Sequence, residues 1–192
     1  RDPGETGAHV QRVGAYCAEI FHRIAVKRGL CQEEIKRRKD LARIASMLHD
    51  VGKVGVPDGV LKKPGPLNGE ELAVMRRHCI HGAKLFERSH SELDVMAGEI
   101  ALYHQEKWDG SGYPEGLAGE AIPLSARLMA IADVYDALIS RRVYKGAMSH
   151  EEAMIILRQG RGTHFDPEIF DVFLEVEADF RRIAISLSDG DE

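Results

Sequence analysis

Residues 41–53 read LARIASMLHDVGK, a run in which apolar side chains recur at helical spacing and end on a histidine and an aspartate. The apolar positions are Leu41, Ile44, Ala45 and Leu48. This i, i+3, i+4, i+7 pattern places side chains on one face of a helix. The sequence therefore predicts a helix that leads into the adjacent pair His49 and Asp50.

Stripes with the same period recur on both sides of this run, and no alternating run long enough for a useful strand is present. Further helices are expected over 10–24, 70–86, 97–104, 125–140, 149–159 and 166–176. Asn68 follows a breaker-rich segment and is the expected cap of the helix over 70–86. The sequence therefore predicts an all-α fold.

Length and composition describe an ordinary globular chain of 192 residues, 44% hydrophobic and 30% charged. A chain of this size buries roughly 70% of its unfolded surface, so one domain over 1–192 is expected. The polar tail over 186–192 is expected to fray. The net charge of −5 offers no basic field for DNA. No apolar run approaches the roughly 20 residues that span a bilayer.

Three cysteines, Cys17, Cys31 and Cys79, lack CxxC spacing, which argues against a disulfide framework and for a reducing cytosol. Each is expected to be a small buried hydrophobic residue. The chain starts at Arg1 rather than at Met, so we expect a piece of a longer protein.

Three polar residues stand where helical periodicity calls for apolar ones: His9, His104 and Asp133. Burying an unpaired carboxylate costs several kcal/mol at least, so Asp133 is expected to face a cation or a dense set of donors. A single inward histidine is more often a core residue with an ordinary hydrogen-bond partner. Two such histidines, an aspartate and the pair His49 and Asp50, all from separate helices, instead favour a metal site in a bundle.

The donor types are imidazole and carboxylate, with no thiolate evident, which favours iron, manganese or another borderline divalent ion over a zinc–thiolate site. Adjacent His49 and Asp50 can serve two ions, because one carboxylate can bridge them. Two ions roughly 3.5–4 Å apart suit phosphoryl displacement. Phosphodiester hydrolysis is thus favoured over acyl transfer, for which we find no serine nucleophile elbow and no Cys/His pair.

Several segments, taken in order, resemble the HD-GYP domains of the HD metal-dependent phosphohydrolase superfamily, over nearly the whole chain. They are ETGAHVQRV (5–13), HDVGKVGVPD (49–58), KPG (63–65), His78 with Gly82, HQEKWDGSGYP (104–114), DVYDAL (133–138), RVYK (142–145) and FDP (165–167). The resemblance implies a single helical-bundle domain with a central metal site, commonly preceded by a sensory or receiver domain.

The resemblance also implies hydrolysis of cyclic di-GMP to linear pGpG or GMP, with a mixed cyclic GMP–AMP dinucleotide as second choice. The implied metal ligands are His49, Asp50, His78, His104 and Asp133, with Glu5 and His9 added where a third ion binds. Lys53 matches a lysine that reaches the scissile phosphate, so Lys53 and Asp50 are the implied catalytic residues. Arg142 and Lys145 match residues that hold the phosphates and base edges. Two or three divalent ions, iron or manganese, are the expected cofactors.

Two positions depart from the family pattern. Gln105 stands where a second histidine is usual before Glu106, and its amide oxygen is a poorer donor than imidazole for a borderline ion. An ion position that depends on Gln105 is therefore expected to be weakened, rebuilt with water or absent. Val143 replaces a common proline and removes no functional group.

The segment 108–114, WDGSGYP, has two interpretations. As a connecting turn, its glycines provide positive φ angles and Trp108 packs on the core. As a loop beside the site, it shapes substrate entry or docks a partner, which the resemblance implies is a diguanylate cyclase (GGDEF) domain. We favour a mixture, with Trp108 structural and Tyr113 in contact with substrate. A homodimer through a helix over 2–28 is also expected. The histidines not expected to bind metal are His22, His81, His90, His150 and His164.

Three functions are compatible with these residues. The first is a cytoplasmic cyclic-dinucleotide phosphodiesterase. The second is a metal- and nucleotide-binding signalling module that acts through protein contacts, with catalysis weakened by Gln105. The third is an HD hydrolase of mononucleotides, which does not need the segments 108–114 and 142–145.

Overall fold

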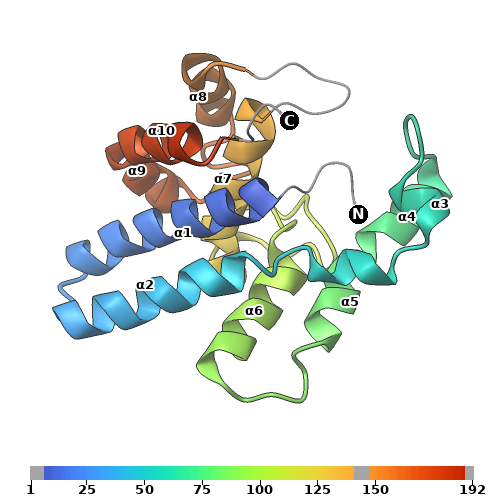
Figure 1. Ribbon diagram of the computed structural model, residues 1–192, viewed down its shortest axis with the longest axis horizontal. Coiled ribbons are helices and arrows are strands. Elements are labelled where there is room, and N and C mark those ends of the chain that lie inside the picture. The colour runs from blue at the N-terminus through green and yellow to red at the C-terminus, as the bar shows by residue number, and fades with distance from the viewer. Residues whose placement is uncertain (1–6, 141–147, 189–192) are drawn as a thin grey trace.

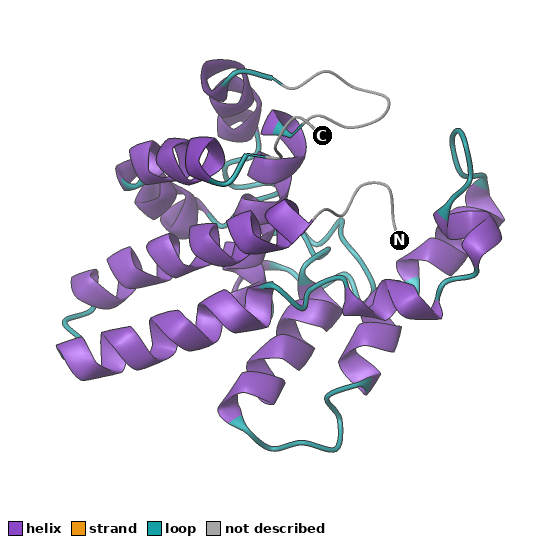
Figure 2. Cartoon of the chain, in the orientation of Figure 1, coloured by secondary structure: helices purple, strands orange, loops and turns teal. Residues whose placement is uncertain are grey.

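The computed structural model describes residues 7–140 and 148–188, and within these ranges the chain forms helices and no strand (Figure 2), as the sequence predicts. The long helices are α1 (Gly7–Lys27), α2 (Gln32–Ser46), α6 (Glu92–Tyr103) and α7 (Leu124–Ile139). The shorter elements are η1 (Val51–Gly55), α3 (Asp58–Leu61), α4 (Gly69–Arg76), α5 (His78–Lys84), η2 (Gly119–Ala121), α8 (His150–Gln159), α9 (Pro167–Glu175) and α10 (Glu177–Ser186).

Helix α1 lies at the centre of the fold. It runs beside α2 and also packs against α7, α9 and α10 (Figure 1). In the core the ring of Tyr16 stacks on Phe180 with centroids 4.4 Å apart and meets the edge of Tyr135 at 5.3 Å. Sequence periodicity did not predict α10, which supplies Phe180 and completes this aromatic cluster.

Helices α4 and α8 each begin directly after a residue whose side chain caps the first turn. The side chain of Asn68 accepts a hydrogen bond from the Glu71 N–H at 2.9 Å, and the Glu71 carboxylate accepts one from the Asn68 N–H at 2.8 Å. Ser149 and Glu152 form the same reciprocal pair at the start of α8. Each pair satisfies two N–H groups that a helix start leaves without partners. The expected cap at Asn68 is confirmed.

The single helix expected over 70–86 is wrong, because the chain breaks between α4 and α5 at Arg77. The Arg77 N–H bonds to Val74 O at 3.1 Å, which tightens the last turn of α4. Nδ1 of His78 then donates to Met75 O at 2.7 Å. This bond occupies one of the carbonyls that α4 leaves free at its end and fixes the ring of His78.

The cysteines are not paired with one another: Cys17 and Cys79 are buried, whereas Cys31 is exposed. The expectation of burial is therefore wrong for Cys31, which precedes α2 in extended backbone. Among the described helices, none combines the length and apolar character needed to cross a membrane. Helix α10 ends at Ser186, and residues 189–192 of the expected polar tail lie outside the described ranges.

Candidate metal centre

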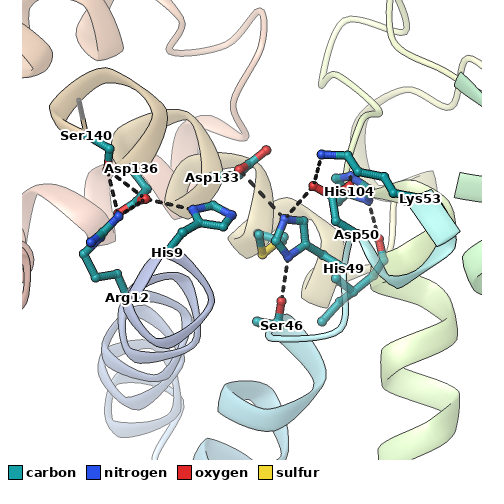
Figure 3. Close-up of polar contacts among 12 residues, drawn as sticks. His9, Arg12, Ser46, His49, Asp50, Lys53, His104, Asp133, Asp136 and Ser140 are labelled. Carbon is teal, nitrogen blue, oxygen red and sulfur yellow. Dashed lines mark hydrogen bonds and ion pairs between the residues drawn. The ribbon is translucent and has the colours of Figure 1, made fainter. Parts of the chain in front are cut away.

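The polar residues that the sequence singles out meet in the interior (Figure 3). His9 comes from α1, His49 and Asp50 from the turn after α2, His78 from α5, His104 from the end of α6 and Asp133 from α7. All four imidazoles are buried. Because α2 ends at Ser46, His49 and Asp50 lie in the turn beyond the helix, just before η1.

Asp50 stands between two groups of imidazole nitrogens. Its Oδ1 lies 3.2 Å from His78 Nε2 and 3.5 Å from His104 Nε2. Its Oδ2 lies 3.2 Å from His49 Nε2 and 2.8 Å from Lys53 Nζ. Such a carboxylate has the geometry to bridge two cations.

The second group consists of His9, His49 and Asp133, which each offer one donor atom within 4.8 Å of the others. His49 Nε2 and Asp133 Oδ1 are 4.0 Å apart. The side chain of Asp133 is 23% exposed, whereas that of His49 is 1% exposed. The cluster therefore meets solvent on the side of Asp133.

Each imidazole is oriented by a bond from its other ring nitrogen, Nδ1. The acceptors are Ser46 O for His49 at 2.9 Å, Met75 O for His78 at 2.7 Å, Ile100 O for His104 at 3.0 Å and Asp136 Oδ2 for His9 at 2.8 Å. A backbone carbonyl can only accept, so Nδ1 carries the proton in the three rings that bond to one. In a neutral ring the Nε2 lone pair is then free to bind a cation.

The donor atoms fit divalent cations. Nε2 of His49 and Oδ1 of Asp50 are buried and have no hydrogen-bond partner among the described residues. Lone pairs of neutral imidazoles that face a carboxylate repel it unless a cation or bound protons lie between them. Imidazole and carboxylate are ligands of borderline first-row ions.

The pKa values reflect the same arrangement. Burial opposes protonation of His49, but the neighbouring Asp50 carboxylate outweighs it and raises the pKa of His49 to about 9. Burial likewise works against ionisation of Asp50, yet the imidazoles of His49, His104 and His78 close to its carboxylate hold its pKa well below its usual range. In this arrangement Asp50 stays ionised and His49 takes up a proton near neutral pH.

A second layer of contacts orients His9. Asp136 is fully buried, and its Oδ2 meets Nδ1 of His9 while Arg12 holds both carboxylate oxygens, at 2.6 and 3.0 Å. The Ser140 hydroxyl adds a bond to Oδ2 at 3.1 Å (Figure 3), and Arg12 Nη1 donates to Leu187 O at 2.9 Å. Neither Arg12 nor Asp136 was predicted from the sequence to act at the site. The available signal was a second aspartate three residues after Asp133, on the same face of α7.

Of the expected substrate-binding residues, Lys53 and Tyr113 lie within the described ranges. Lys53 lies at the cluster through its contact with Asp50. Tyr113 is partly buried, and burial raises its pKa. Its ring lies 4.8 Å from Arg76 Cζ, and its N–H bonds to Gln105 O at 3.2 Å. The other residues expected at the site, Glu5, Arg142 and Lys145, lie outside the described residues.

The five histidines not expected to bind metal belong to neither donor group among the described residues. His150, for example, bonds to the hydroxyl of Tyr135 at 2.8 Å, and His164 stacks on Phe165.

The loop after His104 is held by Glu106, whose carboxylate accepts hydrogen bonds from the N–H groups of Glu115, Gly116 and Leu117. Trp108 N–H bonds to His164 O at 3.1 Å, which ties the start of the loop to the chain before α9. These bonds hold the loop beside the cluster.

A helical bundle in which four buried histidines gather around the carboxylate of Asp50 defines a candidate metal-binding domain. The sequence matches the HD domain family over residues 7–169. A probable cyclic di-GMP phosphodiesterase of Vibrio cholerae is 49% identical over 195 aligned residues, covering 98% of this chain and 44% of the relative. A 3′3′-cGAMP-specific phosphodiesterase 2 of the same organism is 45% identical, covering 96% of this chain and 34% of the relative.

Among solved structures, an HDG"Y"P protein from Bdellovibrio bacteriovorus aligns with a TM-score of 0.59 at 22% identity, covering 87% of this chain and 52% of that protein. This likeness supports the fold alone. The chain belongs to the HD domain family and, within it, to the HD-GYP group. It spans less than half the length of the two curated relatives above.

Proposed function

We propose that this chain hydrolyses a 3′–5′ phosphodiester of a cyclic dinucleotide, with cyclic di-GMP as first choice and a mixed cyclic GMP–AMP dinucleotide second. The names of the relatives support this class of substrate. The observation that carries the proposal is the position of Asp50, whose Oδ1 faces the Nε2 atoms of His78 and His104 and whose Oδ2 faces Nε2 of His49. Such a centre suits hydrolysis of a phosphodiester, in which attacking and leaving oxygens both need stabilisation.

The proposed ligands divide between two ion positions. His49, Asp133 and His9 would hold one ion, and His78 with His104 a second, with Asp50 shared between them. Glu5 is the further ligand proposed for a third ion. Iron or manganese suits this mixture of imidazole and carboxylate. When bound, the ions would supply positive charge to the phosphate oxygens and lower the pKa of a water molecule.

The side chains around the ligands have separate tasks. Lys53 Nζ carries a positive charge at the edge of the cluster and would hold an oxygen of the scissile phosphate. Asp50 stays ionised and would supply a shared negative charge to both ions. Arg142 and Lys145 would hold the remaining phosphate and the base edges, since a guanidinium forms bidentate bonds and an ammonium supplies a compact charge. In the reaction water adds to phosphorus, the bond to the sugar oxygen breaks, and that oxygen leaves with a proton.

The test is incubation of protein loaded with iron or manganese under anaerobic, reducing conditions with cyclic di-GMP and, separately, 3′3′-cyclic GMP–AMP. Chromatography should reveal a linear dinucleotide or mononucleotides from at least one of them. Intact substrate with both metals, in protein whose bound ions have been counted, would contradict the proposal.

A second function, a weakly catalytic signalling module, is favoured by one observation: Gln105 replaces the usual histidine beside His104. Tight nucleotide binding without turnover would support it. Gln105→His separates the two cases, because raised activity or metal content would identify a weakened ligand position. In either case we propose that the residues act as one domain in the cytoplasm and that the loop over 108–114 contacts a GGDEF domain or substrate through Tyr113. A homodimer through α1 is a further proposal.

A further inference from the structure

Cys79 lies beside one of the two proposed ion positions. It follows His78 in α5, and its side chain is fully buried. Its Sγ is 3.5 Å from His78 Nε2. Donor atoms of Cys79, His78 and His104 all lie within 4.8 Å of one another. From the sequence alone no thiolate was expected at the centre.

The separations of His78 Nε2 from His104 Nε2 and from the sulfur of Cys79 match edges of a tetrahedral metal site. Bonds of about 2.0–2.1 Å to nitrogen and about 2.3 Å to sulfur place two nitrogens about 3.4 Å apart and a sulfur and a nitrogen about 3.6 Å apart. The observed separations are 3.4 Å between His78 Nε2 and His104 Nε2 and 3.5 Å between His78 Nε2 and the sulfur. Asp50 Oδ1 completes the set at 3.2 and 3.5 Å from the two nitrogens.

Burial by itself does not explain this placement, as Cys17 demonstrates. Cys17 is equally buried, but its sulfur faces the thioether of Met129 at 3.8 Å, and it belongs to neither donor group of the described residues. Cys31 is exposed. Among the described cysteines, the one in α5 has its sulfur grouped with two imidazole nitrogens, and both nitrogens lie near an oxygen of Asp50 that is buried and lacks a hydrogen-bond donor.

We propose that Cys79 is a ligand of the ion held by His78, His104 and Asp50. This inference rests on the metal centre of the proposed function and extends its donor set to sulfur. The thiol would give up its proton to solvent on binding, since the thiolate is the ligand. A soft donor favours zinc or iron over manganese at this position. It also offsets the imidazole that is missing where Gln105 replaces histidine.

Cobalt(II) tests the proposal without any substrate, because a cobalt–thiolate bond gives a strong charge-transfer band in the near ultraviolet that nitrogen and oxygen ligands do not give. The full chain is freed of metal, loaded anaerobically with cobalt, and its bound cobalt is counted. We expect the band in the unmodified protein and its loss in Cys79→Ser, together with at least about a ten-fold weaker affinity for the ion, as ligand-shell changes typically produce. Cys17→Ala and Cys31→Ser are the matched controls and should keep the band.

Bound cobalt with no band in the unmodified protein, or a band that persists in Cys79→Ser, would overturn the sulfur ligand and leave the proposed hydrolysis intact. Protein that binds no cobalt, iron or manganese would overturn both. Helical circular dichroism checks that each variant is folded, and the spectrum of the unmodified protein decides the question even if Cys79→Ser does not fold.

Discussion

Asp50 is the residue whose loss should affect the centre most, because its carboxylate faces both sets of imidazoles. In Asp50→Ala we expect metal retention and turnover to be abolished together, since removing the shared anion leaves imidazoles as the main donors. Metal content by elemental analysis and cleavage of cyclic di-GMP are the measurements. Asp58→Ala is the matched control, because Asp58 is an exposed carboxylate that pairs with Lys62. Two ions retained in Asp50→Ala would exclude the bridging role.

Replacement of Asp136 should have a different effect on metal binding, because Asp136 acts through His9. In Asp136→Asn the bond to Nδ1 is weakened or reversed, and the ring loses the carboxylate that fixes its orientation. We expect about 10–100-fold weaker binding of the ion held by His9, as is typical when such a supporting carboxylate is changed. Metal titration measures this directly.

Tyr135→Phe is the control for Asp136→Asn, since the neighbouring tyrosine bonds to His150 and not to a proposed ligand. Unchanged binding of every ion in Asp136→Asn would mean that His9 does not ligate metal or needs no orientation.

The contrast between Asp133 and Asp136 defines what the sequence could predict at the scale of single residues. Helical spacing places both on one face of α7, and so it predicts that each points inward. It cannot tell which one meets the ion position and which one meets Arg12. That difference depends on where α1 crosses α7, a tertiary contact that no local pattern encodes. Cys79 was missed although it directly follows the expected ligand His78, because a buried cysteine is usually a small hydrophobic residue and local spacing does not show that its sulfur lies near His104.

At the scale of elements, the approach of η1 to α5 determines how Asp50 meets His78. A Cβ at position 52 would lie 1.9 Å from His78 O and 2.3 Å from Gly82 N, so only glycine fits there. Gly52→Ala should push the two elements apart and destabilise the fold by about 3 kcal/mol, the upper end for overpacking. We expect a Tm lower by roughly 6–12 °C and weaker metal binding.

Gly59→Ala is the control for Gly52→Ala, because a Cβ at position 59 would meet no atom within 4 Å. An unchanged Tm in Gly52→Ala would mean that the contact between η1 and α5 is looser than the structure indicates.

The elements with strong apolar periodicity and clear caps were predictable, as α1, α7, α8 and α9 demonstrate. The break at Arg77 was not, because the residues around it favour helix and the bond of His78 to Met75 O, which accompanies the break, leaves no mark on apolar periodicity. Helix α10 was missed as well. Phe180 is the one fully buried residue of α10, so the sequence of this helix contains too few inward apolar residues to indicate a buried face.

At the scale of the whole molecule, the metal centre joins two parts of the bundle. His9 and Asp133 belong to α1 and α7, which share the aromatic core with α9 and α10, whereas His78 and His104 belong to α5 and α6. His49 and Asp50 lie in the turn that connects these parts along the chain (Figure 1). Ions bound there would therefore stabilise the whole fold, because metal that binds only the folded chain lowers its free energy.

The acid stability of the whole fold depends in part on His164, a buried histidine that is not itself a proposed ligand. Burial, with a smaller effect from Lys107, lowers the pKa of His164 from 6.5 to about 4. Between these values the unfolded chain binds the extra proton and the folded chain does not. The stabilising contribution of neutral His164 is therefore full above pH 6.5 and is lost as the pH falls towards 4, at up to about 1.4 kcal/mol per pH unit.

His164→Phe tests this contribution, because phenylalanine keeps the stacking on Phe165 but cannot take up a proton. We expect the variant to lose less stability than the unmodified protein between pH 6.5 and 4, measured by urea unfolding at a series of pH values. His90→Phe is the control, since His90 is exposed and its replacement should leave the slope unchanged. If the free energy of unfolding falls equally with pH in His164→Phe and in the unmodified protein, His164 is protonated equally in the folded and unfolded states. The loss of stability in acid would then come from other groups.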